Sequence, residues 1–203
     1  MDFDAKAQEW DNDPVKLERA AAVAAAIRNR VRLSPDLSAL EYGCGTGLLS
    51  FALSRELGSI TLADSSAGML AVLREKIAAS GADHLRPMRL DLTVDPLPAE
   101  RYDLIYTLMT LHHVSDVDRI LRDFHALLRP DGALCIADLD REDGSFHGAG
   151  FDGHHGFERE ALRDRLARAG FGEIQFDTCY MMRKSQGEGA REYPVFLAVA
   201  RKA

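Results

Sequence analysis

The sequence predicts an α/β fold: a doubly wound, mostly parallel sheet of seven strands, with helices on both faces and an antiparallel hairpin at the C-terminal end. Three observations lead to it. Short apolar runs alternate with segments of helical spacing along most of the 203 residues, as a parallel sheet with crossover helices requires. A glycine-rich turn follows the first run, and no helical segment separates the last two. Right-handed crossovers then favour a Rossmann-like arrangement.

The strands are predicted from short apolar runs that end at glycine, proline or polar residues. They are 38–42, 60–63, 87–92, 103–108, 133–138, 173–182 and 195–201. The last two are expected to pair antiparallel, joined by the polar segment 183–194.

The helices are predicted from apolar spacing and from residues typical of helix ends. They are 14–33, 46–57, 66–79, 116–128 and 158–169. Asp13 can cap the first helix, and Pro14 suits its first turn. Gly58, Gly81 and Gly170 are placed to close three of the others.

Length and composition indicate one globular domain over 1–203, with 46% hydrophobic and 28% charged residues. Within it we distinguish a helical cap (1–34), a ligand-binding core (38–138), a Gly/His-rich loop (139–157) and a C-terminal helix with a strand pair (158–203). The longest apolar runs fall short of the ~18–20 residues that span a bilayer, so membrane insertion is not expected.

Charge and cysteine content narrow the possible partners. The net charge of −7 disfavours binding to nucleic acid, which depends on clustered Lys and Arg. The acidic first residues are unlike a signal peptide, and three separated cysteines without a C-x-x-C indicate neither a disulfide framework nor a zinc finger. We therefore expect a cytoplasmic protein.

The glycine-rich turn at 43–47 is the most informative segment. Glycines between a strand and a helix let the backbone turn sharply and let a ligand approach closely. The spacing is G-x-G-x-G, and Leu48 occupies the place of the last glycine in a dinucleotide fingerprint. The lysine of a phosphate-binding P-loop is also missing. Glu41 would repel phosphate but would suit an ammonium group.

The motif E-Y-G-C-G-T-G resembles the first motif of class I S-adenosylmethionine-dependent methyltransferases. Further segments resemble that family's later motifs in the expected order: ITLAD, MRLDL, YDLIYTLMTLHHV and LRPDGA. The resemblance covers roughly residues 38–138. The opening FDAKAQEWD is similar to small-molecule members near the ubiquinone and menaquinone biosynthesis methyltransferases.

The resemblance implies S-adenosyl-L-methionine as cofactor, S-adenosyl-L-homocysteine as product, and a small-molecule methyl acceptor. Glu41 would lie near the cofactor's amino group, Asp64 would bind the ribose, and Asp91 would accept from the adenine amino group or, alternatively, only cap a loop. The implied cofactor-binding residues are Glu41, Gly43, Cys44, Gly45, Gly47, Asp64, Ser65, Met69, Asp91, Leu92 and Thr107.

Methyl transfer from a sulfonium needs alignment, and it needs a base only when the acceptor must lose a proton. The Gly/His-rich loop after the fifth strand is a candidate lid over the acceptor. Its catalytic candidates are His147, His154 and His155, for which ordered packing is the alternative. His112 is interpreted as packing after the fourth strand, and no metal ligands are assigned.

Two other functions stay open. One is a protein that binds the cofactor without turnover, and the other is a nicotinamide-dependent oxidoreductase, which Leu48 and the missing Tyr-x-x-x-Lys disfavour. Phe3 and Trp10 are interpreted either as part of a lid over the cofactor or as ordinary packing. The acceptor atom and the oligomeric state do not follow from the sequence.

Overall fold

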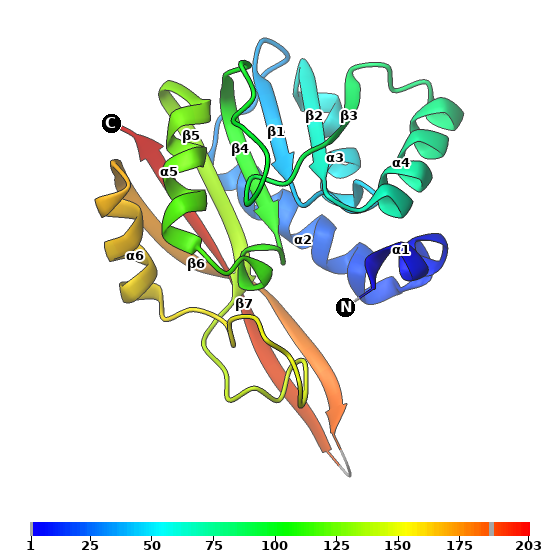
Figure 1. The fold of residues 1–203 in the computed structure, drawn as a ribbon, viewed down its shortest axis with the longest axis vertical. Coiled ribbons are helices and arrows are strands. Elements are labelled where there is room, and N and C mark those ends of the chain that lie inside the picture. The colour runs from blue at the N-terminus through cyan, green and yellow to red at the C-terminus, as the bar shows by residue number, and fades with distance from the viewer. Residues whose placement is uncertain (1, 187–188) are drawn as a thin grey trace.

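The computed structural model describes residues 2–186 and 189–203. Its centre is one sheet in the order β3-β2-β1-β4-β5-β7-β6 (Figure 1). The strands are β1 (Ser38–Tyr42), β2 (Ser59–Asp64), β3 (Leu85–Arg89), β4 (Tyr102–Leu108), β5 (Leu128–Leu139), β6 (Phe171–Gln186) and β7 (Gly189–Lys202). The first five pair in parallel, and β7 pairs antiparallel with both β5 and β6. The predicted doubly wound sheet with its C-terminal hairpin is confirmed.

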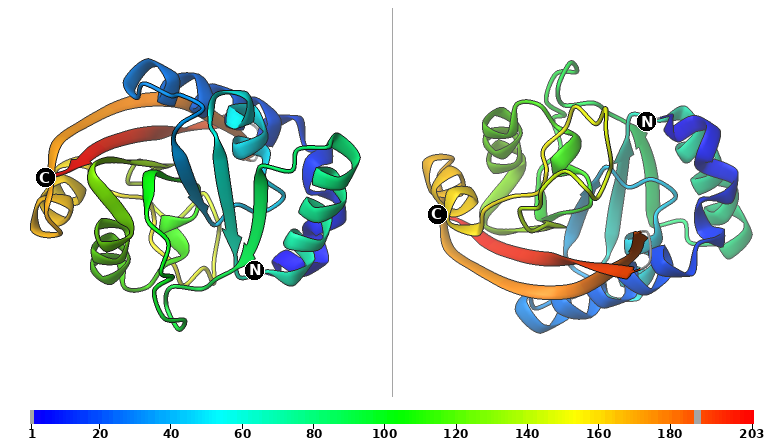
Figure 2. Two further views of the ribbon diagram at one scale, coloured as in Figure 1. Left: turned by 90° about the horizontal axis from the view of Figure 1, so that it is seen from above. Right: turned by 90° about the horizontal axis from the view of Figure 1, so that it is seen from below.

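The helices cover both faces of this sheet (Figure 2). They are α1 (Phe3–Lys6), α2 (Pro14–Arg30), α3 (Leu48–Leu53), α4 (Ala67–Ser80), α5 (Val117–Leu127) and α6 (Arg159–Arg168), with 3-10 turns η1 (Ala7–Asn12), η2 (Ser54–Glu56) and η3 (Leu111–His113). Buried residues of α2, α3 and α4 pack on one face, and those of α5 and α6 on the other. Among the described residues, no helix is long and apolar enough to cross a membrane.

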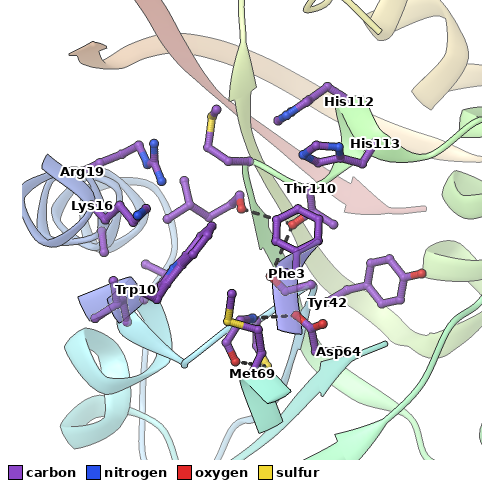
Figure 3. Close-up of a pocket in the computed structure, with 18 of the residues that line it drawn as sticks. Phe3, Trp10, Lys16, Arg19, Tyr42, Asp64, Met69, Thr110, His112 and His113 are labelled. Carbon is purple, nitrogen blue, oxygen red and sulfur yellow. Dashed lines mark hydrogen bonds between the residues drawn. The ribbon is translucent and has the colours of Figure 1, made fainter. Parts of the chain in front are cut away.

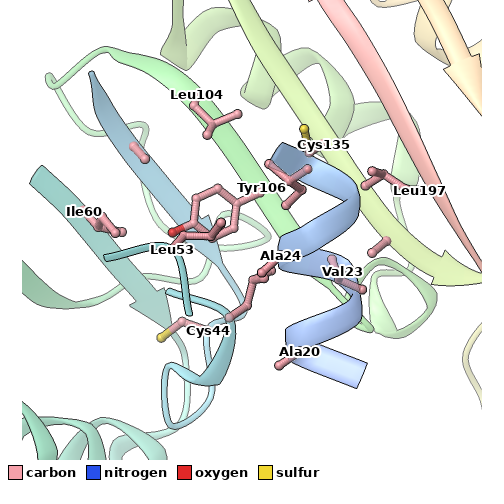
Figure 4. Packing of buried hydrophobic residues seen from close by; sticks show 14 of the residues in the cluster. Ala20, Val23, Ala24, Cys44, Leu53, Ile60, Leu104, Tyr106, Cys135 and Leu197 are labelled. Atoms are coloured by element: carbon pink, nitrogen blue, oxygen red, sulfur yellow. The ribbon is translucent and has the colours of Figure 1, made fainter. Parts of the chain in front are cut away.

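Helix α2 shows how local sequence fixes an element that borders the site. Asp13 caps it by accepting from the Val15 amide at 3.0 Å, and Pro14 occupies its first turn. Val23 and Ala24 of its inner face are fully buried against the sheet (Figure 4). This packing fixes the position of α2, whose first turns line the cavity at the carboxyl ends of the strands.

Several predicted boundaries were wrong. Helix α2 ends at Arg30, because Val31 is already extended, with φ −125°. Strand β3 ends at Arg89, so the predicted strand 87–92 was placed about two residues late and 90–92 form a loop. The polar segment 183–194 was predicted as a connection, but its described residues belong to β6 and β7. Cross-strand pairing of Arg183 with Glu192, which form an ion pair at 2.9 Å, keeps these polar residues in the ladder.

Candidate active site

The glycine turn after β1 adopts a left-handed backbone conformation that favours glycine. Gly43, Gly45 and Gly47 have φ values of 71°, 53° and 81°. A Cβ on Gly43 would lie 2.3 Å from the Thr110 side chain, and one on Gly47 would lie 2.8 Å from Leu73. At Gly45 the nearest atoms to such a Cβ are 3.8 Å away or farther. Gly43 and Gly47 therefore serve packing, whereas a Cβ on Gly45 would make only ordinary van der Waals contact with Trp10 and Met69, beside a cavity that Gly45 lines.

This cavity has a volume of about 680 Å³ and lies beyond the carboxyl ends of β1, β2 and β4. Figure 3 shows Asp64 and Met69 at one end of it, Trp10 and Arg19 from the N-terminal segment, and His112 after β4. Phe3 also lines it. The N-terminal segment therefore forms one wall of the cavity, as the lid interpretation of Phe3 and Trp10 requires.

The structure brings most of the predicted cofactor residues together. The cavity lining includes Glu41, Gly43, Cys44, Gly45, Asp64, Ser65, Met69 and Asp91. Gly47, Leu92 and Thr107 are not among the residues that line it. Leu92 is fully buried, and the Thr107 hydroxyl is buried without a hydrogen-bond partner among the described residues.

Asp64 fastens the glycine turn to the end of β2. One carboxylate oxygen accepts from the Gly45 amide at 2.7 Å, and the other accepts from the Ser66 amide at 2.9 Å. Burial raises the pKa of Asp64, and these backbone hydrogen bonds oppose the shift. Each oxygen keeps lone-pair capacity for a further donor, such as a ribose hydroxyl.

Glu41 is buried at the foot of the cavity. Its carboxylate accepts from the Ser50 amide at 3.1 Å and from the Ser50 hydroxyl, which also bonds the Tyr106 hydroxyl at 2.7 Å. Burial is the main cause that raises the pKa of Glu41 to about 8. The group is therefore mostly neutral at pH 7 until a cation approaches it.

Asp91 has a structural task in addition to its place in the lining. Its Oδ1 accepts from the Thr93 amide at 2.9 Å and from the Thr93 hydroxyl at 2.6 Å. Oδ1 of Asp91 therefore caps the loop, as the alternative interpretation stated. Because Asp91 also lines the cavity, its carboxylate can still bind a ligand there.

Of the three predicted catalytic histidines, one lines the cavity and two lie outside it. His147 lines the cavity and stacks on Phe151, with ring centroids 3.9 Å apart. His154 and His155 are outside the lining: His154 Nε2 donates to the Val114 carbonyl at 3.0 Å, and His155 Nδ1 lies 3.4 Å from Glu142. Within the Gly/His-rich loop, only Phe146 and His147 line the cavity.

His112 and Asp138 form a buried pair that the sequence patterns did not predict. His112 Nδ1 donates to Asp138 Oδ1 at 2.6 Å, and the two side chains are 1% and 0% exposed. His112 lines the cavity, and its buried Nε2 has no partner in the described part of the chain. A usable signal was present. His112 follows β4, and Asp138 lies at the end of β5. Because β4 and β5 are parallel neighbours, their carboxyl ends meet at one edge of the sheet.

His113 and His147 adjoin this pair. Ring nitrogens of His112, His113 and His147 lie within 4.8 Å of one another, so the three imidazoles could hold a transition-metal ion. Burial is the main cause that lowers the pKa of both His113 and His147 to about 4. Both rings are therefore neutral near pH 7.

The comparisons with known proteins agree with this geometry. A family model described as a methyltransferase domain matches residues 39–132. The ubiquinone biosynthesis O-methyltransferase of Caulobacter vibrioides is 32% identical over 113 residues, which are 52% of this chain and 42% of that protein. The chain spans less than two thirds of the length of the curated relatives it matches.

Solved structures show the same fold. A SAM-dependent methyltransferase from Aquifex aeolicus has a TM-score of 0.73 at 18% identity, and 98% of each chain is covered. Phosphoethanolamine N-methyltransferase 2 of Haemonchus contortus, solved with S-adenosyl-L-methionine, has a TM-score of 0.72 at 13% identity. That match covers 89% of this chain and 52% of that one.

These findings define residues 39–132 as a methyltransferase domain and the fold as that of S-adenosylmethionine-dependent methyltransferases. The resemblance to that class, predicted from the glycine motif, is confirmed.

Proposed function

We propose that the chain transfers a methyl group from S-adenosylmethionine to a hydroxyl or another protic group of a small molecule, and that His112 accepts the proton the acceptor loses. The observation that carries the proposal is the buried His112–Asp138 pair in the cavity wall, with an Nε2 that has no hydrogen-bond partner among the residues the structure describes. We keep the cytoplasm as the proposed compartment, since Cys44, Cys135 and Cys179 are free thiols.

The cofactor end of the cavity suits a cationic ligand. Asp64, Asp91 and Glu41 give it acidic groups, and Gly45 leaves room for close approach to the backbone. The bound cofactor supplies an activated methyl on a sulfonium, so the protein's task is mainly alignment. In the proposal Asp64 holds the ribose, Met69 packs on the adenine, and Glu41 faces the ammonium group.

Asp138 prepares His112 to act as a base. By accepting from Nδ1–H it fixes the tautomer in which Nε2 carries the lone pair. The buried carboxylate then stabilises the imidazolium that forms when Nε2 takes a proton. Among the three imidazoles in the cavity wall, His112 is the one with a carboxylate partner at 2.6 Å.

The size of the cavity supports a small acceptor. Its volume of about 680 Å³ lies within the ~300–1,000 Å³ typical of small-molecule sites. Aromatic rings of Phe3, Trp10 and Phe146 help to enclose it. A planar, partly apolar acceptor fits such walls.

The test uses radiolabelled S-adenosylmethionine with a library of small phenols, acids and amines. Once an acceptor is found, we expect His112→Gln to lower kcat by ~10²–10⁴-fold while cofactor affinity changes less than about threefold. His154→Gln, outside the cavity, is the matched control and should keep wild-type turnover. Full turnover in His112→Gln would refute the base, and cofactor binding without turnover on any acceptor would favour the binding-protein alternative.

A further inference from the structure

Among the described residues, three cations that line the cavity have no ion-pair partner: Lys6, Arg19 and Lys184. Lys6 is exposed to solvent, whereas Arg19 is buried and Lys184 is partly buried. Arg19 projects from α2 and Lys184 comes from β6. Figure 3 shows Arg19 and Lys16 reaching from the helix toward the cavity, away from Asp64 and Met69. The cationic side chains and the acidic cofactor-binding residues therefore occupy different ends of one space.

The Arg19 guanidinium is buried and has few hydrogen-bond partners among the described residues. It is 9% exposed, and its Nη1 donates only to the Met182 thioether, 3.4 Å away, which is a weak acceptor. Its buried Nε has no partner, and no carboxylate lies within 4.0 Å of the group, among residues 2–186 and 189–203. A buried charge without a counter-ion is strongly destabilising. Its presence in a cavity wall indicates a ligand that brings the opposite charge.

Lys184 adds a second positive charge beside the first. Its Nζ donates to the Phe146 carbonyl at 2.7 Å and lies 3.8 Å from the centroid of the Phe146 ring. Lys184 lies near Arg19, because Arg19 contacts Met182, two residues before Lys184 in β6, and both cations line the same cavity. Burial and then the charge of Arg19 lower the pKa of Lys184. Lys16, by contrast, is already paired with Asp13 at 3.2 Å.

We propose that Arg19 and Lys184 form an anion-binding subsite that takes a carboxylate or a phosphate group of the methyl acceptor. The guanidinium presents a planar fork of donors that matches such oxygens, and the ammonium adds a point charge. That the anion belongs to the acceptor rests on the proposed function, because His112 lines the same cavity. An acceptor held by its anionic end at Arg19 can present its protic atom to His112.

The experiment separates the subsite from the methyl transfer. Calorimetry on the full chain, with and without S-adenosylhomocysteine, compares 4-hydroxybenzoate with 4-hydroxybenzamide and phenyl phosphate with phenol. We expect one anion or both to bind at least about tenfold more tightly than the neutral counterpart, as loss of charge-assisted hydrogen bonds predicts. The pair with the larger ratio identifies the group as carboxylate or phosphate. Equal affinity within both pairs would overturn the proposal.

Variants then assign the effect to residues. Arg19→Met should abolish the preference for the anion, and Lys184→Met should reduce it by about threefold to tenfold. Arg30→Met is the control, since Arg30 lies on the same helix, paired with Asp177 outside the cavity. Arg19→Gln removes the charge but stays polar; it replaces Arg19→Met if that variant does not fold, and it should likewise abolish the preference. An anion preference that survives loss of the guanidinium would also overturn the proposal. Failure of the wild type to bind S-adenosylmethionine, with the anion preference intact, would refute the proposed function alone.

Discussion

Asp138 accepts a hydrogen bond from His112 at two places: from the ring Nδ1 at 2.6 Å and from the backbone amide at 3.2 Å. One carboxylate therefore fixes both the position of η3 and the orientation of the imidazole. We expect Asp138→Asn to lower kcat by ~10²–10³-fold, because the amide can stabilise the wrong tautomer and cannot stabilise an imidazolium. Steady-state kinetics with the identified acceptor measure this. An Asp138→Asn variant with wild-type kcat would show that the pair is only structural.

His147 should contribute no step to the pH–rate profile near neutrality. Its pKa is lowered to about 4, chiefly by burial and then by His112 and His113, so the ring stays neutral above about pH 5. We expect wild type and His147→Gln to give profiles of the same shape between pH 5.5 and 8. Loss of a step in that range in His147→Gln would assign the proton transfer to His147.

Asp64 is expected to matter to the cofactor in two ways, through the ribose and through the Gly45 amide. Asp64→Ala should weaken binding of S-adenosylmethionine about tenfold to a hundredfold, from charge-assisted hydrogen bonds worth ~1.5–3 kcal/mol. Asp64→Asn keeps one oxygen acceptor and should lose less. Calorimetry decides, and an Asp64→Ala loss below threefold would contradict the assignment.

Glu41 should make the protein less stable as the pH rises. Its pKa in the folded state is about 8, against an ordinary 4.5, so unfolding releases a proton between these values. The free energy of unfolding then falls with rising pH across that window, by up to about 1.4 kcal/mol per pH unit. Glu41→Gln should remove this slope and melt at a higher temperature than wild type at pH 8. If the melting temperatures of the two proteins change with pH in the same way between pH 5 and 8.5, Glu41 is not held neutral in the folded state.

A metal ion at His112, His113 and His147 would compete with the base for the same Nε2. If His112 acts as a base, turnover should be unchanged after treatment with a chelator, and added Zn²⁺ should inhibit. Loss of turnover on chelation, restored by Zn²⁺ or another divalent ion, would instead assign a metal to the three imidazoles.

The fold was predictable because its signals are local. Glycines at the turn of 43–47 and the alternating apolar runs indicate the topology without long-range information. Prediction failed in the hairpin, where cross-strand pairing of polar residues decides: Arg183 and Glu192 look like connecting residues until β6 and β7 bring them opposite each other.

The cofactor half of the site was visible for the same reason, since Glu41, Gly45 and Asp64 belong to ordered motifs. The acceptor half was not. His112, Asp138 and Arg19 are separated along the chain, and each has an ordinary local explanation. Only the sheet and the packing of α2 bring them to one cavity.

The most direct test of the account is calorimetric titration of the full chain with S-adenosylmethionine, S-adenosylhomocysteine and NAD. We expect both sulfur compounds to bind at one site per chain and NAD not to bind. Gly45→Val should remove that binding in a folded protein, because the branched side chain would project between Trp10 and Met69 into the space that the ligand is proposed to occupy. Binding of NAD in place of S-adenosylmethionine, or unchanged affinity in a folded Gly45→Val variant, would contradict the central claim.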